Sequence, residues 1–498
     1  MEFPIATNPL FMIVLPKKAQ YNHREIIYMG STQQATKEGA ATEQRLGKPV
    51  LKTIDAIAQS LALGPVFSAV FIAALIAGTA GGAAPLATLI GAIGALALGW
   101  VIIQFARRYT GAGAIYDYLR RQSPALGLFS AIVYFLGTVF EGGAGIYLIL
   151  GIFGSSTLQS DLGLNVPWWA FALGAGVLVF LLNHFGVRIT TRAQITLTTL
   201  SVLPLILLSF VIIGKGGDAG NTLQAFNPTN IPLSGLFGGL LFAVTLFTGF
   251  EASASLGEET ANPRRSIPIA VAGTILLSGV FYLLVIYASD IGFGLSHSQA
   301  WATDPSPLST LATRYVGKWL SVLIDFALLF DMLAVASAFT ATSARGWFSL
   351  ARHDLLPSFF ARTSRFNTPF GGNILVFCTM LIMVGVAFFM KFDPGVAFGV
   401  AAGVGAILIE IIYIVLALSS IRFLIEARKW WGWLILVVAI ATPVLAMYGT
   451  VVPFPAWPLS LEVYVALAGL VLAGIWTLVV LLVYPQRLKA ASEPHAWE

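Results

Sequence analysis

Hydrophobic residues occur along this chain in long continuous runs that short polar segments separate. Each run is long enough to cross about 30 Å of hydrocarbon as an α-helix. A transmembrane barrel would instead show segments of about ten residues with alternating apolar and polar positions. We therefore predict an all-α integral membrane protein with about 12 transmembrane helices. The runs cover approximately residues 54–79, 85–106, 124–153, 167–186, 191–214, 234–257, 266–293, 317–348, 371–391, 395–423, 430–452 and 460–484.

The composition agrees with this class and argues against several others. The 498 residues are 57% hydrophobic and only 10% charged, whereas soluble domains are about a quarter charged. The single cysteine, Cys378, excludes an intramolecular disulfide, and the five histidines lack metal-binding spacing. The sequence shows no nucleophile–base pair, metal cluster or phosphate-binding loop. We therefore expect neither enzyme activity nor ATP-driven transport, and we expect no bound metal ion or cofactor.

The distribution of Lys and Arg predicts the orientation in the membrane. If the N-terminus is cytoplasmic, 24 of the 28 basic residues fall in segments on the inner side. Cytoplasmic loops carry such an excess of positive charge. Both termini are therefore expected in the cytoplasm, and the net charge of +5 needs no nucleic-acid partner to explain it. The low charge and the lack of organelle signals favour a prokaryotic inner (cell) membrane.

The segments outside the runs are predicted to be cytoplasmic tails, at residues 1–50 and 487–498. The apolar stretch 3–16 is interrupted by proline, is too short to span a membrane and lacks the basic start of a signal peptide. Residues from Met29 onward are typical of a cytoplasmic tail, so Met29 is an alternative start of the native protein.

The sixth run contains two residues that a simple membrane anchor would not carry. Gly249 weakens a helix, and the charged carboxylate of Glu251 costs several kcal/mol at bilayer depth unless it faces a cavity or a partner. An interrupted helix is tolerated there only where the freed backbone groups are buried in protein or line a cavity. Two interpretations follow, namely a broken helix over a binding site, or a kinked, packed helix with a hydrogen-bonded Glu251.

The first run is interrupted as well, because Gly64 and Pro65 lie near its middle and proline removes a backbone donor. The first and sixth runs cross the membrane in opposite directions. Two broken helices in this relation are the signature of an inverted repeat with a binding site near the bilayer midplane. We predict a first five-helix repeat at 51–215, a second at 216–425 and two additional transmembrane helices at 426–486.

A stripe of glycines in the tenth run concerns helix packing. Gly395, Gly399 and Gly403 form a stripe of small residues in the tenth run, which allows close approach of a neighbouring helix, and packing alone is the simpler interpretation.

Between the second and third runs, the segment TGAGAIYDYLRR is short, amphipathic and flanked by arginines. We expect this segment along the membrane surface.

Three segments resemble motifs of the amino acid–polyamine–organocation (APC) transporter superfamily. They are LFTGFEASASLGEETANPRRSIP at residues 246–268, SARGWFSLARHDLLP at residues 343–357 and TGAGAIYDYLRR at residues 110–121. Their order and spacing resemble that superfamily across the first ten runs. The resemblance implies an amino acid permease with a 5+5 inverted-repeat fold of the leucine-transporter type, in which runs 11 and 12 lie outside the repeat.

The sequence departs from the superfamily pattern at two positions. Many members carry G-x-G in the first span, where this chain has Gly64-Pro65, and Pro65 offers no N–H to a substrate carboxylate. Ser201 lies where some proton-coupled members have a lysine. The missing lysine leaves Na⁺ coupling, or proton coupling through another group, open.

The two interruptions supply the candidate substrate site. Backbone N–H groups freed in the first run suit a carboxylate, whereas carbonyl groups freed in the sixth run suit an ammonium. Phe250 is a candidate gate, and Glu251 is a candidate partner of an amine. The alternatives are a proline kink filled by water and ordinary packing of the phenylalanines. The predicted substrate-binding residues are Leu63, Gly64, Val66, Phe67, Phe247, Thr248, Gly249, Phe250 and Glu251.

Acidic and hydroxyl side chains inside the runs are candidates for proton or ion coupling. Each acid is either a proton or ion ligand or a protonated residue bonded to a neighbouring helix, and the second interpretation is preferred for Asp325 and Glu410. Ser337 and Thr340 are candidates for a Na⁺ beside the first run. The predicted coupling residues are Glu251, Glu141, Asp331, Ser201, Ser337 and Thr340.

The sixth run ends in a charged segment that is a candidate cytoplasmic gate. Glu258 and Glu259 are expected to be solvated and to form a gate or ion network with Arg264.

Together these features favour a secondary active transporter that moves an amino acid by alternating access. Coupling to H⁺ is preferred over Na⁺, and exchange of one substrate for another is also considered. A polyamine- or ethanolamine-type amine carrier is an alternative, because the Gly-Pro segment alters the carboxylate site. A non-transporting membrane sensor is a third possibility, from another class. The expected partners are the small-molecule substrate, a coupling ion and the lipid bilayer.

Overall fold

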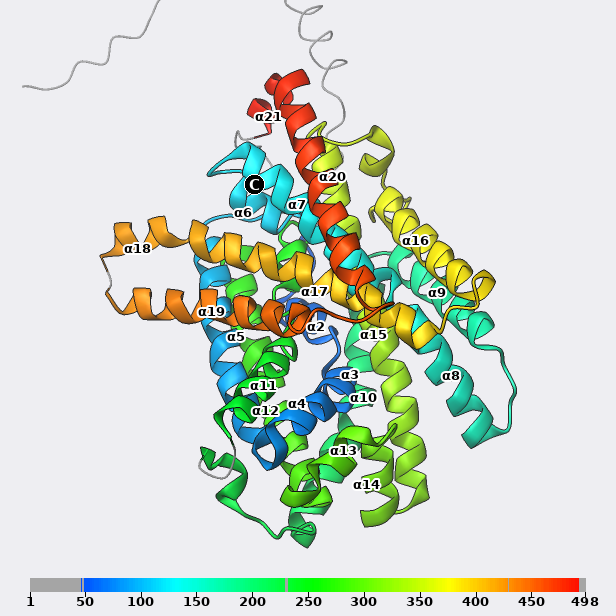
Figure 1. Cartoon of the computed structure of the whole chain (residues 1–498). Coiled ribbons are helices and arrows are strands. Elements are labelled where there is room, and N and C mark those ends of the chain that lie inside the picture. Colours follow the sequence, from blue (N-terminus) through cyan, green and yellow to red (C-terminus); the bar gives the residue numbers. More distant parts are fainter. Residues whose placement is uncertain (1–45, 47–48, 229–231, 429, 492–498) are drawn as a thin grey trace, which may run out of the picture. The chain divides into compact units, whose positions relative to one another are not determined.

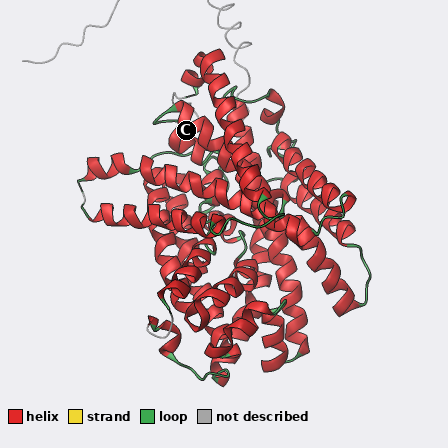
Figure 2. Ribbon diagram, in the orientation of Figure 1, coloured by secondary structure: helices red, strands yellow, loops and turns green. Residues whose placement is uncertain are grey.

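The computed structural model describes residue 46 and residues 49–228, 232–428 and 430–491. Within these residues the structure is helical and contains no strand (Figure 2), apart from the isolated bridges Leu51–Thr260 and Thr363–Pro369. Most of the predicted N-terminal tail and the alternative start at Met29 lie outside the described residues.

The helices of the first half coincide with the first five predicted runs. The first run is divided among three short α-helices and one π-helical segment, and the third run is divided around a second π-helical segment. The elements are α2 (Thr53–Leu61), α3 (Pro65–Phe67), η1 (Ser68–Ile72), α4 (Ala73–Ala80), η2 (Gly81–Ala83), α5 (Ala84–Ala106), α6 (Ile115–Leu119), α7 (Pro124–Thr138), η3 (Val139–Ala144), α8 (Ile146–Leu162), α9 (Trp168–His184) and α10 (Val187–Lys215).

The helices of the second half coincide with the remaining runs and add short helices in the connections. The elements are η4 (Leu223–Phe226), α11 (Leu233–Thr245), η6 (Ala252–Leu256), α12 (Pro263–Phe293), η7 (Leu295–His297), α13 (Ser298–Thr303), α14 (Pro307–Tyr315), α15 (Lys318–Arg352), η8 (Ser358–Ala361), α16 (Phe370–Phe389), α17 (Pro394–Ser419), α18 (Ile421–Ala427), α19 (Trp431–Val451), α20 (Leu461–Val483) and α21 (Pro485–Ala490).

Nine helical stretches of the described chain are long and apolar enough to cross a membrane. The first of them, Thr53–Ala106, contains both the first and the second predicted runs. Two further apolar helices, α9 and α11, are shorter, and α11 is short because the interruption near Gly249 ends it. The chain is therefore a multi-pass integral membrane protein.

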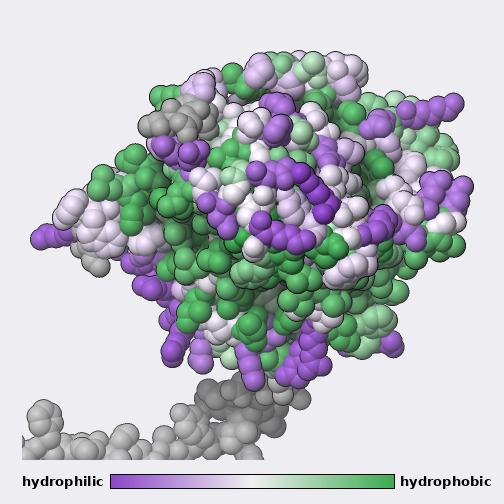
Figure 3. All heavy atoms as spheres, turned by 90° about the horizontal axis from the view of Figure 1, so that it is seen from below, coloured by the Kyte–Doolittle hydropathy of each residue, from purple (hydrophilic) through white to green (hydrophobic). Residues whose placement is uncertain are grey.

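Large apolar side chains cover the outer faces of these helices. Phe210 is 62% exposed, Val280 69% and Leu472 65%, which suits contact with lipid rather than water. Seen from below, the surface shows hydrophilic residues among broad hydrophobic areas (Figure 3). Inside the bundle, α10 packs along α15 and α12 packs along α5, while α17 contacts α7, α19 and α20 (Figure 1).

The segment between α5 and α7 is buried within the protein, whereas a helix along the membrane surface was expected to leave one face exposed. All five residues of α6 are buried. Asp117 accepts hydrogen bonds from Gly113 N at 2.8 Å and from Arg120 Nε at 3.1 Å, so these two charged side chains of the segment are paired inside the protein. Burial raises the pKa of Asp117, and the Arg120 guanidinium opposes this shift.

Candidate functional site

The interruptions of the first and sixth runs lie against each other. Gly64, between α2 and α3, has a φ of 104°, and Gly249, between α11 and η6, has a φ of 94°. Such backbone conformations favour glycine because it has no Cβ. A Cβ added at Gly249 would overlap Leu63 Cδ1 and would lie 3.1 Å from Leu63 Cβ. The two breaks therefore meet only because residue 249 has no side chain.

A cavity of about 470 Å³ lies beside the two breaks. Both π-helical segments, η1 and η3, contribute to its wall, and π-helical turns occur frequently at functional sites. Four residues predicted for the site line this cavity, namely Leu63, Phe67, Thr248 and Glu141. The other lining residues are Ser68, Phe71, Ile72, Leu75, Gly142, Ile146, Phe242, Thr245, Val335, Phe339, Phe398, Gly399, Ala402, Gly403, Ala406, Thr450, Leu459 and Glu462.

The phenylalanines next to the cavity are not the ones expected from the sixth run. Phe250 is 3% exposed and its ring packs 5.8 Å from that of Tyr413. It does not line this cavity but a separate small pocket, which Gly64 and Thr248 also line, so its role as a gate stays a prediction. Phe67 is the central aromatic residue instead, with ring centroids 5.0 Å from Phe71 and 5.8 Å from Phe398.

The backbone groups freed in the first run are partly occupied by the protein itself. The N–H of Phe67 donates to Asp331 Oδ2 at 2.7 Å, and the N–H of Leu63 donates to the Ser60 carbonyl at 3.3 Å. Val66 is completely buried. The carboxylate held at this break is therefore that of Asp331, and the predicted cradle of free N–H groups is smaller than expected.

Asp331 connects the first break with two other helices. It is completely buried on α15, and its Oδ1 lies 3.3 Å from the donating hydroxyl of Ser201 on α10. A buried carboxylate is tolerated where hydrogen bonds compensate for lost water. Ser201 and Asp331, both predicted as coupling residues, thus lie in direct contact at the break.

Glu251 is held by two tyrosines that the sequence did not single out. Its carboxylate accepts from Tyr134 Oη of α7 at 2.6 Å and from Tyr413 Oη of α17 at 2.7 Å. Tyr413 Oη also accepts from the N–H of Gly249 at 3.3 Å. Glu251 is 1% exposed and does not line the cavity. The only available signal was a polar aromatic tip in an apolar run, which is too common to be specific.

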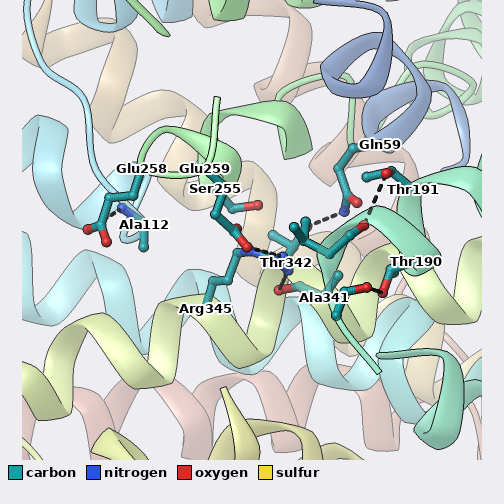
Figure 4. Close-up of polar contacts among 12 residues, drawn as sticks. Gln59, Ala112, Thr190, Thr191, Ser255, Glu258, Glu259, Ala341, Thr342 and Arg345 are labelled. Carbon is teal, nitrogen blue, oxygen red and sulfur yellow. Dashed lines mark hydrogen bonds and ion pairs between the residues drawn. The ribbon is translucent and has the colours of Figure 1, made fainter. Parts of the chain in front are cut away.

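The hydroxyls predicted for a Na⁺ site lie elsewhere. Ser337 Oγ accepts from Asn183 Nδ2 and Gln194 Nε2, each at 3.3 Å, so it faces α9 and α10 rather than the first run. Thr340 lies beside a separate small cavity lined by α8, α9 and α16. The gap between the first run and α15 is instead bridged by Gln59, whose Nε2 donates to the Ala338 carbonyl at 3.0 Å and to Thr342 Oγ1 at 3.3 Å (Figure 4).

The charged segment after η6 forms ion pairs with α15 and not with Arg264. Glu259 pairs with Arg345 through two contacts of 2.6 and 3.2 Å (Figure 4). Glu258 pairs with Arg352 at 2.9 Å and accepts from the N–H of Ala112 at 3.2 Å. Arg264 is exposed.

The expected solvated network is therefore a nearly water-free one. The paired side chains are 2–7% exposed. Arg345 and Arg352 are two helical turns apart and share one face of α15. The sequence pattern singled out both acids, but their partners lie nearly a hundred residues away in the sequence, so no local pattern could predict them.

Breaking one of these pairs is expected to destabilise the protein strongly. Glu259→Gln leaves Arg345 buried without its carboxylate, which costs about 3–5 kcal/mol. We expect a clear fall of the thermal denaturation midpoint of the purified protein in detergent. The exchange Glu259→Arg with Arg345→Glu should recover most of that fall, and Arg264→Gln should behave like the wild type. A midpoint unchanged by Glu259→Gln would contradict the role assigned to the pair.

Two facing breaks in membrane-spanning helices, beside a cavity with few polar groups, characterise a multi-pass membrane protein with an internal small-molecule site. The chain belongs to the amino acid permease family, whose model matches residues 52–484. This is a family of transporters rather than enzymes, within the APC superfamily.

Several curated relatives of the chain are amino acid transporters that differ in substrate. The chain is 31% identical over 230 residues to the cationic amino acid transporter 3, mitochondrial, of Arabidopsis thaliana, covering 43% of this chain and 35% of that protein. It is 26% identical to the glutamate/serine transporter AimA of Bacillus subtilis, covering 39% and 37%. It is 26% identical to the dicarboxylic amino acid permease of Saccharomyces cerevisiae, covering 42% and 38%. The chain thus spans little more than a third of the length of these relatives.

Proposed function

We propose that this chain is a secondary active transporter that moves an amino acid through the cavity between the two breaks by alternating access. The observation that carries the proposal is the direct contact of the break at Gly64 with the break at Gly249, next to a cavity of about 470 Å³. Midplane sites between two broken helices are typical of such transporters, and the family assignment supports the same activity.

We propose twelve membrane crossings arranged as the two repeats 51–215 and 216–425, followed by two additional helices within 426–486. The excess of basic residues supports cytoplasmic tails at both ends, in a prokaryotic cell membrane. In this orientation the ion pairs of Glu258 and Glu259 close the cytoplasmic end. The cavity reaches Leu75 and Leu459 near the opposite end, which corresponds to an outward-facing state.

Asp331 is the proposed coupling residue, and H⁺ is the preferred ion. A proton on Asp331 would weaken its hold on the Phe67 N–H, because a neutral carboxyl is a weaker acceptor than a carboxylate. That amide lies in the first break, next to the cavity, and would become available to a substrate carboxylate. Na⁺ coupling through Asp331 and Ser201, and substrate exchange, are the alternatives.

Uptake by purified protein in liposomes tests this function. We expect accumulation of at least one labelled amino acid under an inward pH gradient, and little under an inward Na⁺ gradient. Asp331→Asn should abolish the gradient dependence while the protein keeps its thermal midpoint to within a few degrees. Accumulation driven only by Na⁺ would replace H⁺ as the coupling ion, and no transport of any amino acid, with or without internal substrate for exchange, would overturn the function.

An amine carrier without a carboxylate requirement is the second candidate. The occupied N–H of Phe67 favours it, since it leaves fewer donors for a substrate carboxylate. Transport of decarboxylated amines but not of the parent amino acids in the same assay would favour this candidate.

A further inference from the structure

A carboxylate from outside the two proposed repeats reaches the cavity. Glu462 lies in the first turn of α20, is 7% exposed and lines the cavity. In the part of the chain that the structure describes, no side chain forms a hydrogen bond or ion pair with its carboxylate, and its oxygens are not among the fully buried atoms, so they reach the open space of the cavity. A carboxylate among mainly apolar residues needs water or another polar partner. Its position therefore makes it available to a group that enters the cavity.

The glycine stripe of α17 is what admits this carboxylate. A Cβ at Gly403 would overlap Glu462 Oε2 and would lie 2.9 Å from Glu462 Cβ. One turn earlier, a Cβ at Gly399 would lie 3.1 Å from Leu459 Cδ2. The stripe was interpreted as helix packing alone, but at Gly403 it also provides the space through which Glu462 approaches the cavity.

A second carboxylate lines the same cavity from the opposite side of α17. Glu141 belongs to η3, and its Cβ lies against Gly405. Glu141 Oε2 is buried without a hydrogen-bond partner. The cavity lining contains no Lys, Arg or His, so its acidic and basic side chains are these two carboxyl groups alone. Low-dielectric walls strengthen the field of such groups and concentrate cations.

We propose that the cavity selects a substrate with a second, basic group on a long apolar stem, and that Glu462 is the residue that binds that group. Phe67, Phe71, Phe339 and Phe398 line the cavity, and aromatic rings pack well against alkyl chains and cations. The proposal rests on the proposed transport function and names the substrate class of the same cavity. Among the differing substrates named for the relatives, the proposal assigns basic amino acids to this cavity.

Competitive uptake in liposomes tests the proposal. The probes are labelled lysine and arginine as basic amino acids, leucine as a neutral one, and glutamate as an acidic one. We expect the basic pair to be transported with the lowest KM. Glu462→Gln should raise the KM for lysine about tenfold to hundredfold with a much smaller change in kcat, because a buried charge partner is lost.

A steric variant provides a second and independent arm. Gly403→Ala should raise the KM for lysine in the same direction, since its Cβ would displace the Glu462 carboxylate. Glu426→Gln, on the exposed face of α18, and Gly474→Ala, which has open space on α20, are the matched controls and should keep the wild-type KM.

The outcomes separate this proposal from the transport function. Transport of leucine or glutamate without the basic pair would overturn the substrate class and leave the function standing. An unchanged lysine KM in Glu462→Gln, or a loss of pH dependence with the substrate preference unchanged, would also overturn the role of Glu462. Absence of any amino acid transport would overturn the function itself. If Glu462→Gln does not fold, the wild-type panel and Gly403→Ala decide the question.

Discussion

Replacing Glu251 with glutamine is expected to abolish gradient-driven uptake while the protein still folds. The carboxylate accepts from both Tyr134 and Tyr413, at 2.6 and 2.7 Å, whereas a glutamine amide offers one acceptor oxygen and an NH₂ that can only donate. One tyrosine could therefore no longer donate to residue 251 and would have to accept from the NH₂ instead. A hydrogen bond to a charged group contributes about 1.5–3 kcal/mol. If that energy is lost from the transport cycle, the uptake rate is expected to fall about tenfold to hundredfold or more.

The location of these bonds explains why transport should suffer more than stability. Tyr134 is on α7 and Tyr413 is on α17, and Tyr413 also accepts from the N–H of Gly249. Glu251 therefore connects the sixth-run break with two neighbouring helices that a rocking motion would move. Uptake of the labelled substrate in liposomes and the thermal midpoint in detergent measure the two effects separately.

Graded variants keep this test interpretable. Tyr134→Phe and Tyr413→Phe each remove one donor and should reduce uptake less than Glu251→Gln. Glu426→Gln changes an exposed carboxylate and should be neutral. If Glu251→Gln retained full wild-type uptake with its pH dependence, Glu251 would have no part in the mechanism and would be a packing residue.

A side chain at position 249 is expected to eliminate uptake. Gly249 has a φ of 94°, and holding another residue in that conformation costs on the order of 1–3 kcal/mol. Its Cβ would in addition overlap Leu63 Cδ1. Gly249→Ala should therefore push the two breaks apart, and Gly249→Leu should do so further. We expect uptake below about a tenth of the wild-type rate in the alanine variant.

The two causes can be separated by changing the other break. In the double variant Leu63→Ala with Gly249→Ala the overlap is relieved but the backbone strain stays, so only partial recovery of uptake is expected. Gly174→Ala on α9, where a Cβ would meet nothing within 4 Å, is the matched control. Normal uptake by Gly249→Leu would show that the contact between the breaks is not required.

The sequence could predict the class of this protein because the bilayer imposes simple rules. A spanning helix needs about twenty apolar residues, so the long runs marked the helices to within a few residues. Glycine and proline weaken a helix wherever they occur, so Gly64 and Gly249 marked both breaks, and the motif segments indicated the family. The acids Glu141, Glu251 and Asp331 attracted attention because a charge inside a membrane-spanning run is costly, and Glu258 and Glu259 because they lie in a charged segment at the end of such a run.

What the tertiary structure decided was the partner of each of these groups. The sequence suggested Arg264 for the acids after η6, but α15 presents Arg345 and Arg352 there. It suggested free N–H groups at the first break, but Asp331 occupies that of Phe67. Such pairs join helices far apart in the chain, and their geometry depends on how the helices are rotated and packed.

The wall of the cavity was likewise decided by the tertiary structure and not by the sequence pattern. From the sequence, Glu462 belonged to a helix outside the repeat, and Gly403 to a packing stripe. Only the crossing of α20 over α17 brings the two together at the wall of the cavity. Local composition determined where this chain crosses the membrane and where its helices break. Contacts between distant helices, which no local pattern encodes, decided which side chains face one another and which face the cavity.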